Sequence, residues 1–535
     1  MRKKAVPSLK SDATQAVYWL RSEVFEQGVL PISLPPSYSL ASLMKISAEL
    51  TDLTMVTFSE WLNVSSKCLG ISNDLAMVLF NAFEAIFIDD PTVTLQNTRD
   101  ELGAQENGLL DAYRANKSVP LPSFLIFLFI QLYHRNSPLA SPRHDVWPQE
   151  ASTVASVGMQ PMLSPTRAMA LSARVTDHED QLQFVKRHLY DMLVLVALGK
   201  YKVSLPQIQD FQLLLYEGEN LTKETSFGSL MPCWQKPAQS KEQPADKTQL
   251  VDISVLQTYV SQRLVQNSAL YPSVDLPTNR SSTKATWQQN TKAYINSLSG
   301  VTKSLFVRTA ENMNPQNKIV RIYCNHQANI YLLMPLQHVA IFGCTNCTII
   351  LGTVSRMVTI EHCEKVRVVC ATKFLRINHS ADTRIYACIN TRPVIGSGNK
   401  NIEMAPYNIH YPALEHHMQV AGINPKLNYW DMPICLSKDV CVGPLPASLF
   451  SSIAIPFNVQ GITVCNPCPL PLEYSQELRR KTTIVNQLCE KIRQMSDNNG
   501  EGKRLIHSHF REWLVNSGNL RHVLDLLYHD DKESQ

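Results

Sequence analysis

The sequence predicts a β-solenoid flanked on both sides by helical regions. Apolar residues recur at helical spacings between residues 15 and 135. After residue 318 this spacing gives way to short β-branched alternations with a repeat of about 19 residues, which is typical of a solenoid. Two amphipathic stretches follow residue 473. Because 535 residues exceed one ordinary core, we expect several domains.

The region before the repeat is predicted to be helical over 1–137 and again over 181–270, with polar linkers over 138–180 and 271–304. Its strongest helical segments are LASLMKISAEL, DLAMVLFNAFEAIF and SFLIFLFIQLY. The apolar run 124–130 is far shorter than the roughly 20 residues that span a bilayer, so it predicts a buried helix and no membrane span. The basic N-terminus lacks the apolar segment of a secretory signal.

Successive units of the repeat are predicted to start at Val320, Val339, Val358, Leu375 and Val394. Each unit reads as a strand, a tight corner and a second strand. Stacking the units about 4.8 Å apart pairs each strand with the next coil and buries one ladder of apolar side chains. The pattern therefore predicts a β-helix.

Cysteines occupy interior positions of this ladder. The chain has 13 cysteines, which without a secretion signal favour reduced thiols in an intracellular protein over a disulfide framework. A buried free cysteine acts as a small hydrophobe, so we interpret the ladder positions as structural. Zinc binding by the two CxxC pairs is the alternative, which we consider the weaker because the pairs lie far apart in sequence. The cysteines concerned are Cys344, Cys347, Cys363 and Cys370 in the ladder, and Cys465 and Cys468 in the second pair.

Charge gives little support for nucleic-acid binding. The formal net charge is +4, and the sequence has no block of five or more like charges. No phosphate-binding loop or catalytic motif of a hydrolase is present either. His410, His416 and His417 lie near Glu415, but surface histidines are the simpler interpretation than a metal site. We expect no metal, no cofactor and no self-contained active site.

Two motifs after the repeat carry a resemblance. The segments APYNIHYP and NYWDMP, together with the solenoid, resemble the C-CAP/cofactor C-like domain of the tubulin-binding cofactor C family over residues 305–435. Their expected structural residues are Pro406, Tyr407, Tyr411, Pro412, Asn428, Trp430 and Asp431. The resemblance implies a right-handed parallel β-helix, followed by a C-terminal extension over 436–535 with two helices.

The wider plan, with a long helical N-terminal region and a helical tail containing FREWLVNSGN, resembles one subgroup of that family. This resemblance implies a protein of the cytoskeleton, located at the centrosome or spindle pole. It further implies centrosomal partners and roles in centrosome and Golgi positioning, cell shape and cytoskeletal organisation.

Catalytic relatives use a surface arginine of the β-helix as an arginine finger for tubulin or a small GTPase. The resemblance maps this role onto Arg376, whose neighbours Leu375 and Ile377 are predicted to point inward, so that Arg376 faces outward. An arginine suits the role because its planar, permanently charged fork meets phosphate oxygens bidentately. The chain departs from the catalytic pattern three positions earlier, where Lys373 replaces a glutamine.

Three functions stay open on this basis. The first is a non-enzymatic scaffold of the microtubule-organising centre that binds partners through outward residues, namely Tyr323, Phe342, Arg321 and Arg384. The second is a GTPase-activating protein that acts through Arg376 on tubulin or an Arf-like GTPase. The third is a tubulin-folding cofactor that binds tubulin without catalysis.

Overall fold

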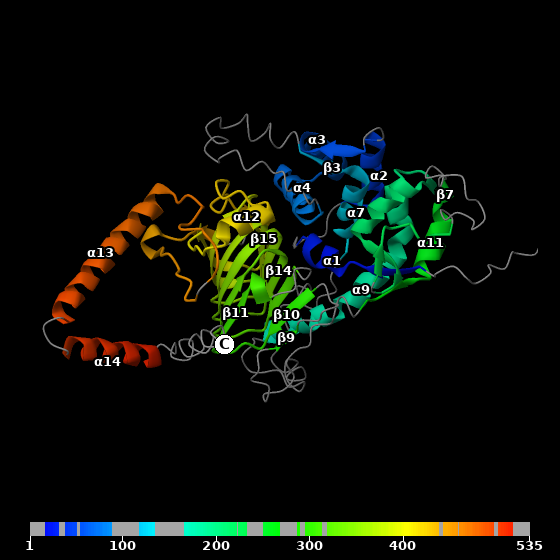
Figure 1. Cartoon of the computed structure of the whole chain (residues 1–535). Helices are drawn as coiled ribbons and strands as arrows, with labels where there is room; N and C mark the ends of the chain where they lie inside the picture. The colour runs from blue at the N-terminus through cyan, green and yellow to red at the C-terminus, as the bar shows by residue number, and fades with distance from the viewer. Residues whose placement is uncertain are drawn as a thin grey trace, which may run out of the picture.

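The structure, a computed structural model, describes residues 16–30, 38–50, 54–87, 117–133, 165–221, 223–232, 250–267, 286–288, 295–312, 318–437, 442–457, 459–496 and 501–516. Three parts lie side by side in Figure 1. An N-terminal unit, drawn in blue to green, packs against a central β-helix. Two helices, drawn in orange and red, project from the opposite side.

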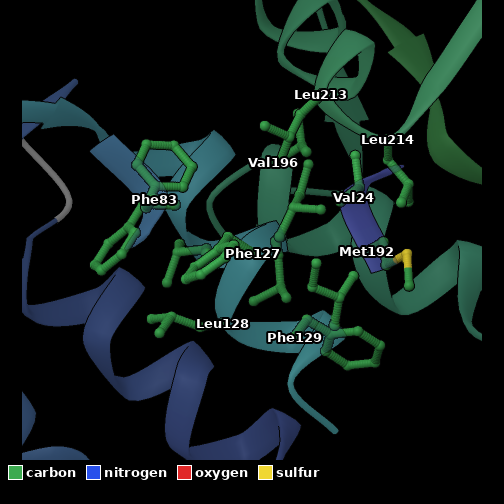
Figure 2. Close-up of a cluster of buried hydrophobic side chains, with 14 of the residues drawn as sticks. Val24, Phe83, Phe127, Leu128, Phe129, Met192, Val196, Leu213 and Leu214 are labelled. Atoms are coloured by element: carbon green, nitrogen blue, oxygen red, sulfur yellow. The ribbon is translucent and has the colours of Figure 1, made fainter. Parts of the chain in front are cut away.

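The N-terminal unit is built around a buried aromatic core. Phe83 packs edge-on against Phe124 and Phe127, with ring centroids 5.2 and 5.4 Å apart. Figure 2 shows Phe127 in one buried cluster with Val24, Val196 and Leu214, which come from other elements. All ten residues of α7 are buried, as the sequence predicted for its apolar run. The helices are α1 (Ser22–Gly28), α2 (Leu40–Glu49), α3 (Phe58–Leu69), α4 (Asn73–Phe87), α7 (Leu121–Ile130), α9 (Pro165–Val196), α10 (Leu205–Ile208) and α11 (Ile253–Ser261), with the short 3-10 helix η1 (Gln209–Leu213).

Strands also contribute to this unit, which the sequence predicted as helical. One sheet has the order β6-β5-β1-β8, and two pairs, β2–β3 and β4–β7, complete the unit. A single core joins the regions predicted as two helical segments, and α9 begins at Pro165, inside the predicted linker. The strands are β1 (Val17–Leu20), β2 (Met55–Thr57), β3 (Ser118–Pro120), β4 (Lys202–Val203), β5 (Leu215–Asn220), β6 (Lys223–Thr225), β7 (Val251–Asp252) and β8 (Leu264–Val265).

The β-helix confirms the solenoid prediction. Its first face is formed by β10, β12, β14, the second halves of β15 and β16, then β18 and β20. Its second face is formed by β11, β13, the first halves of β15 and β16, then β17, β19 and β21. The strands, with the edge strand β9, are β9 (Thr286–Gln288), β10 (Ile295–Ser299), β11 (Leu305–Thr309), β12 (Ile319–Tyr323), β13 (Asn329–Leu333), β14 (Leu336–Phe342), β15 (Thr348–Glu361), β16 (Arg367–Asn378), β17 (Ala381–Ile389), β18 (Val394–Ile395), β19 (Lys400–Pro406), β20 (Ile434–Cys435) and β21 (Val442–Pro444). The predicted linker 271–304 therefore includes β9 and β10.

The strand register agrees with the first four predicted unit starts and corrects the fifth. Val320, Val339, Val358 and Leu375 pair in turn along the first face. Val394 pairs with Arg376 instead of Leu375, so it belongs to the outward column. Its side chain accordingly packs into the core of the N-terminal unit.

Each coil turns its corner through two residues with left-handed backbone, three positions apart. Asparagine and glycine tolerate this conformation best, whereas most other residues pay a steric cost. Glycine or a polar residue occupies each of these corner positions except Cys324. The pairs are Gly300 and Lys303, Cys324 and Gln327, Gly343 and Asn346, His362 and Lys365, His379 and Asp382, and Gly398 and Asn401.

The ladder cysteines are buried in the β-helix, as predicted. Cys344, Cys363 and Cys370 are fully buried, and Cys347 is 2% exposed. The Cys344 and Cys363 thiols lie against backbone carbonyls of their own and the preceding coil. Burial raises the pKa of Cys370 to about 12, which keeps this thiol protonated. These contacts support a structural role.

Segments that follow β19 cover further parts of the β-helix. Helix α12 (Leu414–Ala421) lies on β15, where the Thr353 hydroxyl donates a 3.0 Å hydrogen bond to the His417 carbonyl. The strap, defined as residues 442–457 and 459–471, includes the 3-10 helix η3 (Ala447–Leu449) and packs Phe457 on Tyr331 of the second face. Helices α13 (Leu472–Ser496) and α14 (Glu501–Asn516) follow, as the sequence predicted. Within the described ranges, no helix has the length and hydropathy to cross a membrane.

Candidate functional site

Arg376 lies in the second half of β16, on the first face of the β-helix. Its neighbours Leu375 and Ile377 are fully buried inside the solenoid, so its side chain points away from the solenoid interior, as predicted. The prediction that it reaches solvent is wrong, because the residue is only 1% exposed. Helix α1 of the N-terminal unit covers it (Figure 1).

The Arg376 guanidinium binds the C-terminal end of α1. Nη1 donates to the carbonyls of Gln27 and Val29 at 3.0 and 2.7 Å, and Nη2 donates to the carbonyl of Glu26 at 3.0 Å. Nη2 also forms an ion pair with the Glu361 carboxylate at 3.0 Å. Both terminal amino groups, which an arginine finger would offer to phosphate oxygens, are therefore engaged within the chain.

The end of α1 suits a cation for a general reason. The last carbonyls of a helix have no partner within the helix, and the helix dipole places partial negative charge there. No basic residue lies in the last turn of α1 itself. Arg376, distant in sequence, supplies the positive charge and the donors that this helix end needs.

A second arginine joins the same two parts of the molecule. Arg321, on β12, forms a bidentate ion pair with the carboxylate of Glu26, and it is 3% exposed. His178 of α9 lies 3.9 Å from the same carboxylate. Burial lowers the pKa of His178, which favours its neutral form. The prediction that Arg321 is an outward, solvent-facing residue is thus corrected: it is a buried contact of the domain interface.

The aromatic residues proposed for partner binding are also buried. Tyr323 and Phe342 are each 2% exposed, so the expectation of exposed aromatics is wrong. Their rings stack along the first face with centroids 5.3 Å apart. They lie in the register column that also contains Glu361 and Asn378. The phase assigned from sequence is right, but another part of the chain covers the face.

Apolar contacts complete this interface. Met357, Phe374, Val394 and Ile434 of the β-helix belong to the hydrophobic core of the N-terminal unit. We define the residues of both units that meet here as the domain interface. Since it combines an apolar cluster with two buried arginine contacts, it holds the two units together through both packing and charge-assisted hydrogen bonds.

The buried aromatic motif residues belong to the hydrophobic core of the β-helix. Tyr407 and Tyr411 are buried, and the Tyr411 hydroxyl lies 3.0 Å from Nδ1 of His417. Asn428 donates to the Ala387 carbonyl and accepts from the Ile389 amide, which fixes the segment on β17. Trp430 packs edge-on against Tyr474 of α13. Of the remaining motif residues, Pro406 is buried, Pro412 is half-buried and Asp431 is exposed. The packing role predicted for Tyr407 and Trp430 agrees with this burial.

The described part of the chain contains no cluster of three or more metal-ligating side chains. Cys468 is buried against the solenoid whereas Cys465 is exposed, so the two thiols of this CxxC pair occupy different environments. Burial lowers the pKa of His417 to about 4, and it is hydrogen-bonded to Tyr411. The alternative of a zinc site gains no geometric support in these ranges.

Arg384 lies at a different place, in a shallow pocket of about 240 Å³ on the corner of the β-helix. The pocket is lined by Lys365, Val366, Arg367, Asp382, Arg384, Asn401 and Glu403. Arg384 Nε donates to Glu403 at 2.5 Å, and the arginine side chain keeps 41% of its exposure. Of the residues proposed for partner binding, Arg384 is the one that the structure leaves accessible.

Sequence reasoning missed the residues that hold Arg376. Glu361 lies one coil before Arg376 in an outward column, and this phase could have identified it. Glu26 and Gln27 lie about 350 positions away from Arg376, and no local pattern links them to it. Lys365 and Arg367 were also missed, although they and Arg384 line one corner pocket of adjacent coils.

This chain is similar to known proteins, both in its β-helix and over nearly its whole length. Residues 318–434 match the family model described as tubulin binding cofactor C. The chain is 26% identical to TBCC domain-containing protein 1 of Danio rerio, over 96% of this chain and 94% of the relative. It is also 26% identical to the Gallus gallus protein of that name, over 95% and 97%, and 25% identical to the Homo sapiens one, over 96% and 98%.

Proposed function

Since this chain is a tubulin-binding cofactor C-like protein, similar over nearly its whole length to TBCC domain-containing protein 1, we propose that it is a non-enzymatic scaffold of the microtubule-organising centre. In this proposal it acts in the cytoplasm at the centrosome or spindle pole and binds centrosomal proteins. There it regulates centrosome and Golgi positioning, cell shape and cytoskeletal organisation. The proposed location rests on the family resemblance.

One observation supports the absence of catalysis. The finger position, Arg376, has its guanidinium on three carbonyls of α1 and on Glu361, and is 1% exposed. A finger must reach the phosphate of a GTPase bound outside the molecule. To do so here, Arg376 would have to break these bonds and the N-terminal unit would have to leave the first face.

A hydrolysis assay separates the scaffold from a GTPase-activating protein. We expect the full chain, added to GTP-loaded αβ-tubulin or to an Arf-like GTPase, to leave the single-turnover rate of GTP hydrolysis unchanged. The same rate is expected with Arg376→Lys, which keeps the charge. A rate that rises with the parent chain and falls back with Arg376→Lys would overturn the non-enzymatic assignment.

Imaging tests the location. A fluorescently tagged full chain is expected to coincide with a centrosome marker, and its depletion is expected to displace the centrosome from its position beside the nucleus. A uniform cytoplasmic signal, with normal centrosome position after depletion, would contradict the proposal.

A second candidate is binding of tubulin without catalysis, which the match of residues 318–434 to the tubulin binding cofactor C model favours. Co-sedimentation of the full chain with αβ-tubulin tests it. Binding without a change in GTP hydrolysis would support this candidate, whereas failure to bind at micromolar tubulin would exclude it.

A further inference from the structure

Other parts of the chain cover most of the β-helix surface. This limits the places where a partner protein can bind it. The N-terminal unit covers the first face, the strap covers much of the second, and α12 lies on β15. The corner between the first and second faces stays open. Its left-handed residues Gln327, Asn346, Lys365, Asp382 and Asn401 are all exposed.

This corner contains an unbalanced positive charge. Arg367 and Arg384 pair directly across adjacent parallel strands, so their side chains start about 4.8 Å apart. Like charges at this position repel. Arg384 is offset by Glu403, but no carboxylate forms an ion pair with Arg367 in the described part of the chain. Lys365 lies two positions before Arg367 and reaches Glu364 only at 4.0 Å.

The same pocket also offers acceptors. Asp382 accepts a hydrogen bond from Asn401 at 2.8 Å, and Glu403 accepts from Arg384. A compact polyanion such as a polyphosphate would bring further negative charge next to these two carboxylates and would offer them no hydrogen-bond donor. A peptide with acidic side chains brings both carboxylates for the cations and backbone N–H donors for the acceptors.

We propose that the corner pocket formed by Lys365, Arg367 and Arg384 binds an acidic peptide segment of a partner protein. The peptide's carboxylates bind Arg367 and Lys365, and its backbone amides donate to Asp382 or Glu403. The pocket is separate from Arg376 and the domain interface. The outcome of its test is therefore independent of whether the chain stimulates GTP hydrolysis.

A fluorescence anisotropy titration of the full chain with a labelled decaglutamate peptide tests the proposal. We expect saturable binding that weakens with added salt, because exposed charges are screened. Arg367→Glu is expected to weaken binding at least tenfold, and Arg367→Gln by a smaller factor. Lys200→Glu, the same change of charge at an exposed residue of the N-terminal unit, is the matched control and should leave the affinity unchanged.

Circular dichroism confirms that each variant is folded before its affinity is compared. Unlabelled decaglutamate should displace the probe, and inorganic tripolyphosphate at the same charge concentration should do so at least tenfold less well. The proposal is overturned if decaglutamate does not bind. Equal binding by the parent and Arg367→Glu, or equal displacement by tripolyphosphate, would also overturn it.

Discussion

Replacement of Arg376 by alanine is expected to loosen the N-terminal unit from the β-helix. The change removes the hydrogen bonds to three α1 carbonyls and leaves the Glu361 carboxylate, 5% exposed, without the Arg376 cation. Removing one partner of a buried ion pair costs about 3–5 kcal/mol. Since a domain is stable by only about 5–15 kcal/mol, this is a large fraction of the total.

Urea unfolding of the full chain, followed by intrinsic fluorescence, measures this loss. Hydrogen exchange at α1 reports whether the loss is local to the domain interface. The matched control is Arg384→Ala, whose ion pair with Glu403 is 41% and 24% exposed and is worth at most about 1 kcal/mol. If Arg376→Ala costs no more than Arg384→Ala, Arg376 does not hold the two units together and the structural role assigned to it is wrong.

Three further changes test other parts of the fold. Cys370→Ser places a hydroxyl in the fully buried ladder and should cost about 1–3 kcal/mol in urea unfolding, whereas Cys465→Ser, at an exposed thiol, should change stability by less than about 0.5 kcal/mol. The pKa of His417, lowered to about 4, lies below its unfolded value near 6.5, so the unfolded state binds the proton first. Stability should therefore fall by up to about 3 kcal/mol between pH 6.5 and 4, and His417→Gln should remove that part of the pH dependence; an unchanged pH profile would contradict it. A Cβ at Gly352 would lie 2.6 Å from the Met334 carbonyl oxygen, so Gly352→Ala should reduce the free energy of unfolding by about 1–3 kcal/mol through overpacking. The thermal midpoint should fall with it, and an unchanged midpoint would refute this close approach.

The solenoid could be predicted from sequence because its contacts join residues that are close together in the sequence. A residue in the ladder meets the residue about 19 positions later, so the burial of Val339 and Val358 leaves a visible period. The same phase assigned Arg376, Tyr323 and Phe342 correctly to the outside of the coil. It could not show that another part of the chain covers that outside surface.

The domain interface could not be predicted, because its contacts join residues that are far apart in the sequence. The pair of Arg321 with Glu26 joins residues 295 positions apart, and a periodic pattern gives no information at that separation. The short strands of the N-terminal unit were missed for a related reason. β1 is four residues long and pairs with β5 about 200 positions away, so its neighbours in sequence do not reveal its partner.

Arginine-specific labelling tests whether the N-terminal unit buries Arg376. The folded full chain is treated with phenylglyoxal, and the modified peptides are quantified by mass spectrometry over time. Arg367, exposed at the corner pocket, should react quickly, whereas Arg376 and Arg321 should react only after the chain is unfolded. Labelling of Arg376 in the folded chain as fast as Arg367 would show that the N-terminal unit does not bury Arg376.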